Sequence, residues 1–312
     1  MKRLLTVLGT ALVASALMLS GCSSGPEELK GPIVVGSKID TEGSLLAQMI
    51  ILMLRDAGFE VVDKSEFGAS SIVQVALQSG ELDLYPEYTG NGAWLFGESD
   101  SPVWKDAEQG YERVKQLDAE ANDIVWLRPA PANNTWAIAV RRDLATEHNL
   151  TSLADLADLV NSQPTVVKLI GSEEFISSEA ALPAFQEAYG FTIAGDQLVS
   201  VSGGNTTLTE KAAGEGTDGV NAAMAYGTDG TIAAFDLVVL SDPLNVQMVY
   251  EPAPRVRGEI MDQYPEIAGI LDPVFESLTL ELLQELNGRI AVDGENAADV
   301  AGDYLTSNGF LE

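Results

Sequence analysis

The chain has 312 residues, of which 47 are acidic and 17 are basic, so its formal net charge is −30 at pH 7. Nucleic-acid binding requires a basic surface, and this charge excludes it. The field of such a surface repels anions and mildly concentrates cations, although solubility or adaptation to salt explains most of the charge.

The chain contains a single histidine and a single cysteine. These numbers leave almost no room for Ser-His or Cys-His nucleophile pairs or for histidine-based metal sites. His148 lies in the polar stretch ATEHNL, where we expect it on a surface loop. Carboxylate pairs among the 47 acids remain open, but none has a distinctive spacing. We therefore expect no enzyme activity, no metal and no cofactor.

The N-terminus has the pattern of a secretory signal peptide. Two basic residues precede a mostly apolar run, and the segment ends in LSGC, which resembles the lipobox of bacterial lipoproteins. This pattern predicts a signal peptide over residues 1–21, a lipid on the thiol of Cys22 and a flexible tether over 22–31. The alternatives are an uncleaved membrane anchor and an ordinary signal peptide. No later stretch has the length of a membrane span.

The mature chain of about 290 residues is long enough for two compact lobes. Its first half alternates short apolar strands with helices, which predicts parallel pairing in a sheet covered on both faces. The expected strands are Ile33–Gly36, Phe59–Val62, Leu82–Tyr85 and Ile124–Leu127. The expected helices are Ser44–Ala57, Ser70–Gln78 and Asp106–Ala121.

The second half repeats this α/β pattern from Trp136 onward. Its expected strands begin with WAIAV and continue at Val166–Leu169, Leu198–Val201, Val220–Ala225 and Leu237–Leu240. Its expected helices are Ser152–Val160, Ser178–Tyr189 and Thr206–Ala213. An extended, proline-rich segment from Asp242 to Arg257 follows, and the tail is helical.

The stretch DLYPEYTGNG, from Asp83 to Gly92, is the most informative loop. Pro86 stops the preceding strand, because proline cannot donate to a sheet ladder. Ligands of open α/β sheets bind outside the carboxyl ends of the strands, so we expect this loop to form one wall of a cleft. The second half contains a weak echo of it, NAAMAYGTDG at Asn221 to Gly230, which suggests two walls that face each other.

Four aromatic residues lie at strand ends or in loops bordered by Gly, Pro or Asn: Tyr88, Trp136, Tyr226 and Tyr250. One such residue is usually a packing residue. Four that converge would form a box of aromatic faces, which is how proteins hold quaternary ammonium cations.

Three polar residues accompany these aromatics. Lys38, just before the first helix, is either a contact for a ligand carboxylate or a solvated surface residue. Asn91 and Asn134 either bond a ligand or support their own loops.

Several motifs in order resemble one known family: VGSK at Val35–Lys38, DLYPEYTG at Asp83–Gly90, NNTWAIAV at Asn133–Val140 and AYGTDG at Ala225–Gly230. The chain is similar, from about residue 32 to its end, to the substrate-binding lipoproteins of glycine betaine/carnitine/choline ABC transporters. The resemblance implies a two-lobed type II periplasmic-binding-protein fold. Lobe I would comprise residues 32–134 and 248–312, and lobe II residues 135–247, with a ligand cleft between them.

The resemblance also implies residue roles. The cage for the ammonium head would consist of Tyr88, Trp136, Tyr226 and Tyr250. Tyr85 would be a packing residue, Lys38 a carboxylate contact and Asn91 a neighbour of the ligand's polar end.

One departure from the family pattern concerns the stretch FISSEAALP, where Ser178 stands at the position of a carboxylate-binding arginine. A serine does not replace a bidentate arginine. Carboxylate recognition would then fall to Lys38, Ser178 and a helix terminus. This departure disfavours glycine betaine and favours choline, carnitine or a bulkier compound such as ergothioneine.

The sequence therefore predicts a monomeric, extracytoplasmic receptor, lipid-anchored to the cell membrane of a bacterium. It would deliver a small quaternary ammonium ligand to an ABC transporter permease. The alternatives are the same receptor role for another ligand, or an enzyme or surface protein that shares the scaffold but has a drifted cleft.

Overall fold

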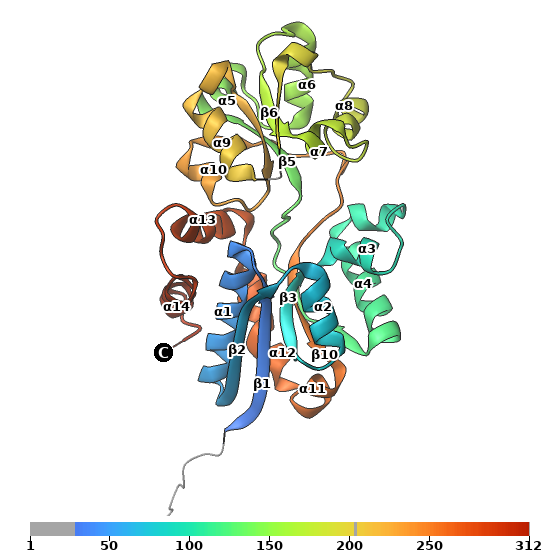
Figure 1. Ribbon diagram of the computed structural model, residues 1–312, viewed down its shortest axis with the longest axis vertical. Coiled ribbons are helices and arrows are strands. Elements are labelled where there is room, and N and C mark those ends of the chain that lie inside the picture. Colours follow the sequence, from blue (N-terminus) through green and yellow to red (C-terminus); the bar gives the residue numbers. More distant parts are fainter. Residues whose placement is uncertain (1–28, 203–204, 312) are drawn as a thin grey trace, which may run out of the picture.

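The computed structural model describes residues 29–202 and 205–311. The predicted signal peptide, Cys22 and most of the tether lie outside the described residues. Within the described ranges, no helix has the length and apolar character needed to cross a membrane. The chain forms two α/β lobes, each built around one five-stranded sheet, and two crossing segments join them (Figure 1). This architecture confirms the predicted fold class.

The first sheet has the strand order β2-β1-β3-β10-β4. Its strands are β1 (Lys30–Lys38), β2 (Phe59–Gly68), β3 (Leu84–Tyr88), β4 (Ile124–Trp126) and β10 (Pro252–Arg257). Strand β1 pairs in parallel with β2 and β3, as predicted, whereas β10 is antiparallel to both β3 and β4. The return of β10 from the far end of the chain brings the proline-rich segment beside the DLYPEYTGNG loop.

The helices of this half fall into two groups. The early ones are α1 (Thr41–Asp56), α2 (Ser70–Gln78), α3 (Gly92–Leu95) and α4 (Ala107–Asn122), with 3-10 turns at η1 (Thr89–Asn91) and η2 (Pro102–Lys105). The late ones are α11 (Gly258–Gln263), α12 (Glu266–Ser277), α13 (Leu280–Ala291) and α14 (Ala297–Ser307). Helix α1 is buried along most of its length, because α12, α13 and α14 pack on it.

The second sheet has the order β7-β6-β8-β5-β9. Its strands are β5 (Trp136–Arg141), β6 (Leu169–Ser172), β7 (Leu198–Val201), β8 (Ala222–Tyr226) and β9 (Leu237–Val239). Its helices are α5 (Arg142–His148), α6 (Leu153–Ser162), α7 (Glu173–Ser177), α8 (Leu182–Tyr189), α9 (Thr206–Glu215) and α10 (Thr231–Ala234), with 3-10 turns η3 (Gly195–Gln197) and η4 (Thr217–Gly219). The chain between β6 and β7 is mainly helical, as an α/β pattern predicts.

The prediction that Pro86 stops its strand is wrong, because β3 continues through Pro86 to Tyr88. Pro86 lies opposite Pro254 of the antiparallel strand β10, a position of the ladder at which neither residue has an N–H to donate.

Two predictions about helices are also wrong. His148 is the last residue of helix α5 and not part of a loop, because Asn149 adopts the left-handed conformation that ends the helix there. The predicted helix Ser178–Tyr189 is shorter and begins at Leu182, with Pro183 in its first turn. Ser178 instead caps the C-terminus of the short helix α7.

The chain crosses between the sheets after β4 and after β9, and these two crossing segments lie side by side. The backbone N–H of Asn134 donates to the carbonyl of Tyr250 at 2.9 Å, and the N–H of Tyr250 donates to Oδ1 of Asn133 at 2.8 Å. We refer below to the elements of the first and second sheets as lobe I and lobe II. The exact residues that bound the lobes stay a prediction.

Candidate ligand-binding cleft

A cavity of about 1000 Å³ lies where the two lobes meet. Its walls come from the ends of β1 and β3 in lobe I, the ends of β5 and β8 in lobe II, both crossing segments and helix α13. Seven of the predicted ligand residues line it: Lys38, Tyr88, Asn91, Asn134, Trp136, Tyr226 and Tyr250. The eighth, Ser178, does not, although its neighbours Glu174, Glu179 and Ala180 do.

The aromatic residues of lobe II are brought together by strand register. Trp136 opens β5 and lies directly opposite Tyr226, the last residue of the antiparallel strand β8. Their rings stack, with centroids 6.5 Å apart and planes 21° apart. Phe175 packs edge-on against Trp136 at 6.2 Å and fixes its orientation. The two similar stretches DLYPEYTGNG and NAAMAYGTDG thus each contribute a tyrosine to the cavity, Tyr88 and Tyr226.

Tyr250 reaches the cavity from the second crossing segment. Glycine at position 90 permits this approach, because a Cβ there would lie 2.6 Å from the carbonyl oxygen of Val249 and 2.8 Å from the Tyr250 ring. The hydroxyl of Tyr250 accepts a hydrogen bond from Nε1 of Trp94 at 3.3 Å. Trp94 also lines the cavity and is 64% exposed. The sequence analysis missed this fifth aromatic, although it follows the DLYPEYTGNG loop by two residues.

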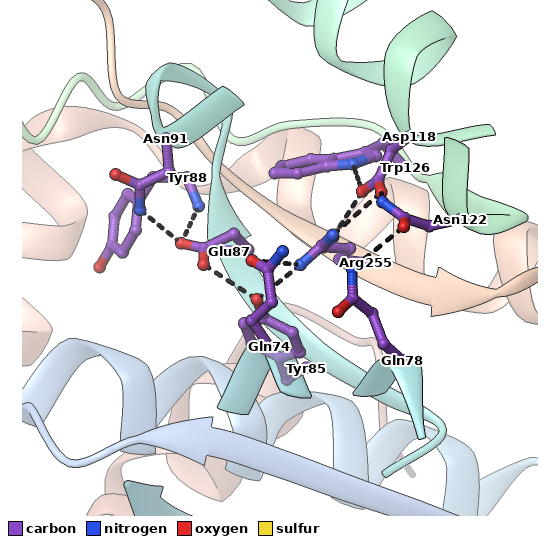
Figure 2. A network of polar contacts seen from close by, with 10 residues as sticks. All are labelled: Gln74, Gln78, Tyr85, Glu87, Tyr88, Asn91, Asp118, Asn122, Trp126 and Arg255. Carbon is purple, nitrogen blue, oxygen red and sulfur yellow. Dashed lines mark hydrogen bonds and ion pairs between the residues drawn. The ribbon is translucent and has the colours of Figure 1, made fainter. Parts of the chain in front are cut away.

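Tyr85 and Tyr88 are separated by the pleat of β3. Tyr85 is fully buried and belongs to the polar network that Figure 2 shows. Its hydroxyl donates to Glu87 at 3.0 Å and accepts from Nη1 of Arg255 at 2.9 Å. Arg255 in turn donates to both oxygens of Asp118, at 2.6 and 3.0 Å. Tyr85 is therefore a buried packing residue, as the sequence predicted.

Glu87 lies at the centre of the lobe I wall and is 1% exposed. One of its oxygens lies 2.5 Å from Nζ of Lys38 and accepts from the N–H of Tyr88 at 2.8 Å and from Nδ2 of Asn91 at 2.7 Å (Figure 2 shows the last two bonds). Burial acts to raise the pKa of Glu87, but Lys38 and these donors outweigh it and hold the pKa below its usual value. Glu87 thus orders three predicted ligand residues at once. The sequence analysis did not single it out.

Lys38 is mostly committed to this ion pair. Its ammonium also lies 4.4 Å from the centroid of the Tyr88 ring, and its side chain is only 10% exposed. Its charge is therefore already compensated by Glu87 before any ligand carboxylate arrives.

Glu42, near the start of α1, is a second buried carboxylate at the cavity that the sequence analysis missed. It accepts hydrogen bonds from the hydroxyl of Tyr88 at 2.6 Å, from Nδ2 of Asn134 at 3.3 Å and from Nδ2 of Asn287 at 2.6 Å. Asn287, on α13, also donates to the carbonyl of Thr228 in lobe II at 3.0 Å. Burial raises the pKa of Glu42, opposed by hydrogen bonds from Thr228, Tyr88 and Asn287.

Behind Tyr226, lobe II carries a pair of buried acids. Asp229 lines the cavity and accepts from the N–H of Tyr226 at 2.7 Å. Glu210 on α9 is fully buried, accepts from the hydroxyl of Thr231 and interacts with Asp229. Burial, followed by the charge of Asp229, raises the pKa of Glu210 to about 9. The pair therefore holds a proton at neutral pH.

Helix α13 connects the two lobes beside this cavity (Figure 1). Gly230, just before α10, touches Gly288 so closely that a Cβ at position 230 would lie 2.2 Å from the Gly288 nitrogen. Gln284 donates to the carbonyl of Gly227 at 2.7 Å. The C-terminal tail is thus part of the junction between the lobes.

Ser178 lies at the end of α7, where its Oγ accepts a 3.4 Å hydrogen bond from the N–H of Ala180. In the described residues, 29–202 and 205–311, no cluster of three or more potential metal ligands occurs.

Two α/β lobes, joined by two crossing segments around an aromatic cleft, define the class of two-lobed solute-binding proteins. The profile of one family, described as the substrate binding domain of ABC-type glycine betaine transport systems, matches residues 31–307. The chain belongs to this family. It is a substrate-binding protein of an ABC importer for quaternary ammonium compounds.

Known proteins of similar sequence and structure agree with this assignment. The chain is 52% identical to the glycine betaine-binding protein YehZ of Escherichia coli (strain K12), over 96% of this chain and 98% of that protein. It is 31% identical to a glycine-betaine-binding protein of Pseudomonas aeruginosa, over 89% of this chain and 88% of that protein. The solved structure of apo YehZ superposes with a TM-score of 0.86 and 53% identity, covering 90% of this chain and all of that one.

Proposed function

We propose that the cleft holds the trimethylammonium head of its ligand in a cage formed by Tyr88, Trp136, Tyr226 and Tyr250. The observation that carries this proposal is that these four aromatics, from both lobes and a crossing segment, line one cavity. A quaternary ammonium has no N–H to donate, so its recognition depends on cation–π and dispersion contacts with such faces. The protein delivers the ligand to a permease and performs no chemistry on it.

The charge of the cleft supports a cationic head group. Six acids and two lysines line the cavity: Asp40, Glu42, Asp100, Glu174, Glu179, Asp229, Lys38 and Lys105. Of the two lysines, Lys38 is paired with Glu87. The lining therefore attracts cations and offers few groups that would hold a ligand carboxylate.

The proposal covers four ligands that differ in their polar end: choline, glycine betaine, carnitine and ergothioneine. Lys38, Asn91 and Asn134 are the residues proposed to meet it. Ser178 is kept in this proposed set although it does not line the cavity, because its neighbours Glu179 and Ala180 do.

The protein is further proposed to be a monomer held at the outer face of the cell membrane by a lipid on Cys22. Membrane fractionation of wild type and Cys22→Ala tests this anchor. The variant is expected in the soluble fraction, and unchanged retention at the membrane would contradict the proposal.

Isothermal titration calorimetry with the four compounds tests the cage. We expect saturable binding of at least one compound and a loss of about 2 kcal/mol or more in Trp136→Ala, because a desolvated cation–π wall disappears. Leu208→Ala, which removes an exposed apolar residue outside the cleft, serves as the control. The cage is wrong if no compound binds, or if Trp136→Ala binds like wild type.

A further inference from the structure

Glu42 is a buried carboxylate without a cationic partner. It is 5% exposed, and no lysine or arginine among the described residues forms a salt bridge with it. Lys38, at the end of the preceding strand, pairs with Glu87 instead, at 2.5 Å. A buried charge is normally paired, because removal of an ion from water is costly.

The hydrogen bonds around Glu42 favour its ionised form, whereas burial disfavours that form and raises the pKa of Glu42. The hydroxyl of Tyr88 and the amides of Asn134 and Asn287 all donate to its two oxygens. An ionised carboxylate is an acceptor only, so three donors suit that form. These donors are neutral, so Glu42 gains a compensating charge only when a cation enters the cleft, and a bound cation would hold it in its ionised form.

This charge acts directly on the cage. Tyr88 donates its phenol proton to Glu42, and hydrogen bonds in a low-dielectric site polarise their partners. A phenol that donates to a carboxylate has a more negative ring face, which strengthens its attraction for a cation. Glu42 also lines the same cavity as Trp136 and Tyr226.

The other acids of the cavity differ from Glu42. Asp40, Asp100, Glu174 and Glu179 are exposed, so water and salt screen their charges. Asp229 lies beside a second acid, Glu210, and repulsion between two such carboxylates disfavours the ionised pair.

We propose that Glu42 is the counter-ion of the bound quaternary ammonium, so that the ligand's own cation supplies the partner that this buried carboxylate lacks. This inference rests on the proposed cage function and adds to it the role of Glu42 and the basis on which the cleft selects its ligand. The cleft selects for the permanent positive charge of the head group, and not only for its shape. An uncharged compound of the same shape is a poor ligand.

The test compares choline with its uncharged carbon isostere, 3,3-dimethylbutan-1-ol, on wild type and on Glu42→Gln. The substitution keeps the size of the side chain and removes its charge. We expect choline affinity to fall about tenfold to a hundredfold, as a charge pair at a partly shielded site implies. Binding of the isostere should change by less than about twofold. Calorimetry measures choline, and ligand-observed NMR titration measures the weaker isostere.

Two further variants complete the design. Glu42→Asp keeps the charge and is expected to bind choline more tightly than Glu42→Gln does. Glu60→Gln removes an equivalent charge from the exposed edge strand β2 and should leave choline binding within about twofold of wild type. Thermal melts confirm that each variant is folded. If Glu42→Gln is unfolded, the comparison of Glu42→Asp with wild type on both ligands decides, because a shifted charge weakens choline selectively.

The outcomes are distinguishable. In one outcome, wild type binds choline and Trp136→Ala does not, but Glu42→Gln weakens the binding of both ligands equally or of neither. Glu42 then only supports Tyr88, and the counter-ion role is overturned. If wild type binds none of the quaternary ammonium compounds, the proposed cage function itself fails.

Discussion

The two walls of the cleft use related sequences and opposite electrostatics. In lobe I, LYPEY ends with Tyr88, and the buried Glu87 beside it forms an ion pair with Lys38. The pKa of Glu87 is therefore lowered. In lobe II, AAMAY ends with Tyr226, and no salt bridge between the described residues involves the buried Glu210 behind it. The pKa of Glu210 is about 9, so this carboxyl group keeps a proton at neutral pH. A tyrosine at a strand end can thus be supported either by an ion pair or by a shared proton.

The difference has a structural cause. Strand β1 lies next to β3 in lobe I and ends at Lys38, whose ammonium pairs with Glu87. Strand β10, also next to β3, carries Arg255, which bonds to Tyr85 and Asp118. In lobe II the hydroxyl of Thr231, which is neutral, donates to Glu210. Charge compensation is therefore available in lobe I, whereas the acids of lobe II depend on protonation.

The largest expected effect is on the anchor of the lobe I wall. Arg255→Met leaves Asp118 buried without its partner, in a network in which Trp126 also donates to Asp118 (Figure 2). We expect the free energy of unfolding to fall by about 3–5 kcal/mol. Urea denaturation measures it.

Arg255→Met combined with Asp118→Leu is the control, because replacement of both charges removes the unpaired group. The double variant should recover most of the loss. A double variant as unstable as the single one would show that packing, and not the charge, is responsible.

The next effect concerns the Lys38–Glu87 pair. Glu87→Gln leaves Lys38 buried and unpaired, so we expect a loss of about 3 kcal/mol at pH 7. The folded-state pKa of Glu87 is lowered, so its contribution is present above the unfolded value of about 4.5 and is lost as the pH falls through the folded pKa. The gap between wild type and variant should therefore narrow from pH 7 to pH 3, and a constant gap in urea titrations would contradict the pairing.

The lobe II pair should respond to pH in the opposite direction. The pKa of Glu210 is raised to about 9, so its stabilising proton is present below the unfolded pKa and the stability is lost as the pH rises toward 9. We expect the wild type to lose up to about 1.4 kcal/mol per pH unit relative to Glu210→Gln between about pH 5 and 9. Thermal melts at pH 5, 7 and 9 measure this difference, and parallel curves would exclude the shared proton.

The smallest expected effect compares the two cage hydroxyls. Tyr88→Phe removes a donor from the buried Glu42 and should cost about 1–2 kcal/mol of stability. The hydroxyl of Tyr226 donates no hydrogen bond to the described residues, so Tyr226→Phe should change stability by less than about 0.5 kcal/mol. Equal losses in urea denaturation would mean that Tyr88 does not depend on Glu42.

The sequence by itself determined the α/β class, the approximate places of the strands and the four aromatics. These features depend on local patterns: apolar runs, and glycines and asparagines around Tyr88 and Trp136. The end of β3 does not, because pairing with β10 carries the strand past Pro86 to Tyr88. The motif VGSK and the YTG loop also carried the family resemblance. Each such signal occupies one short stretch of the chain, so the sequence alone reveals it.

Only the tertiary structure decided which charges meet. Glu42 contacts Tyr88 over 46 residues and Asn287 over 245 residues, and no local pattern pairs residues that far apart. Lys38, which the sequence suggested for a ligand carboxylate, has its charge paired with Glu87. Ser178, which ends helix α7, does not line the cavity. Among 47 acids, burial and hydrogen-bond partners, which arise only on folding, distinguish Glu42 and Glu87 from the solvated surface.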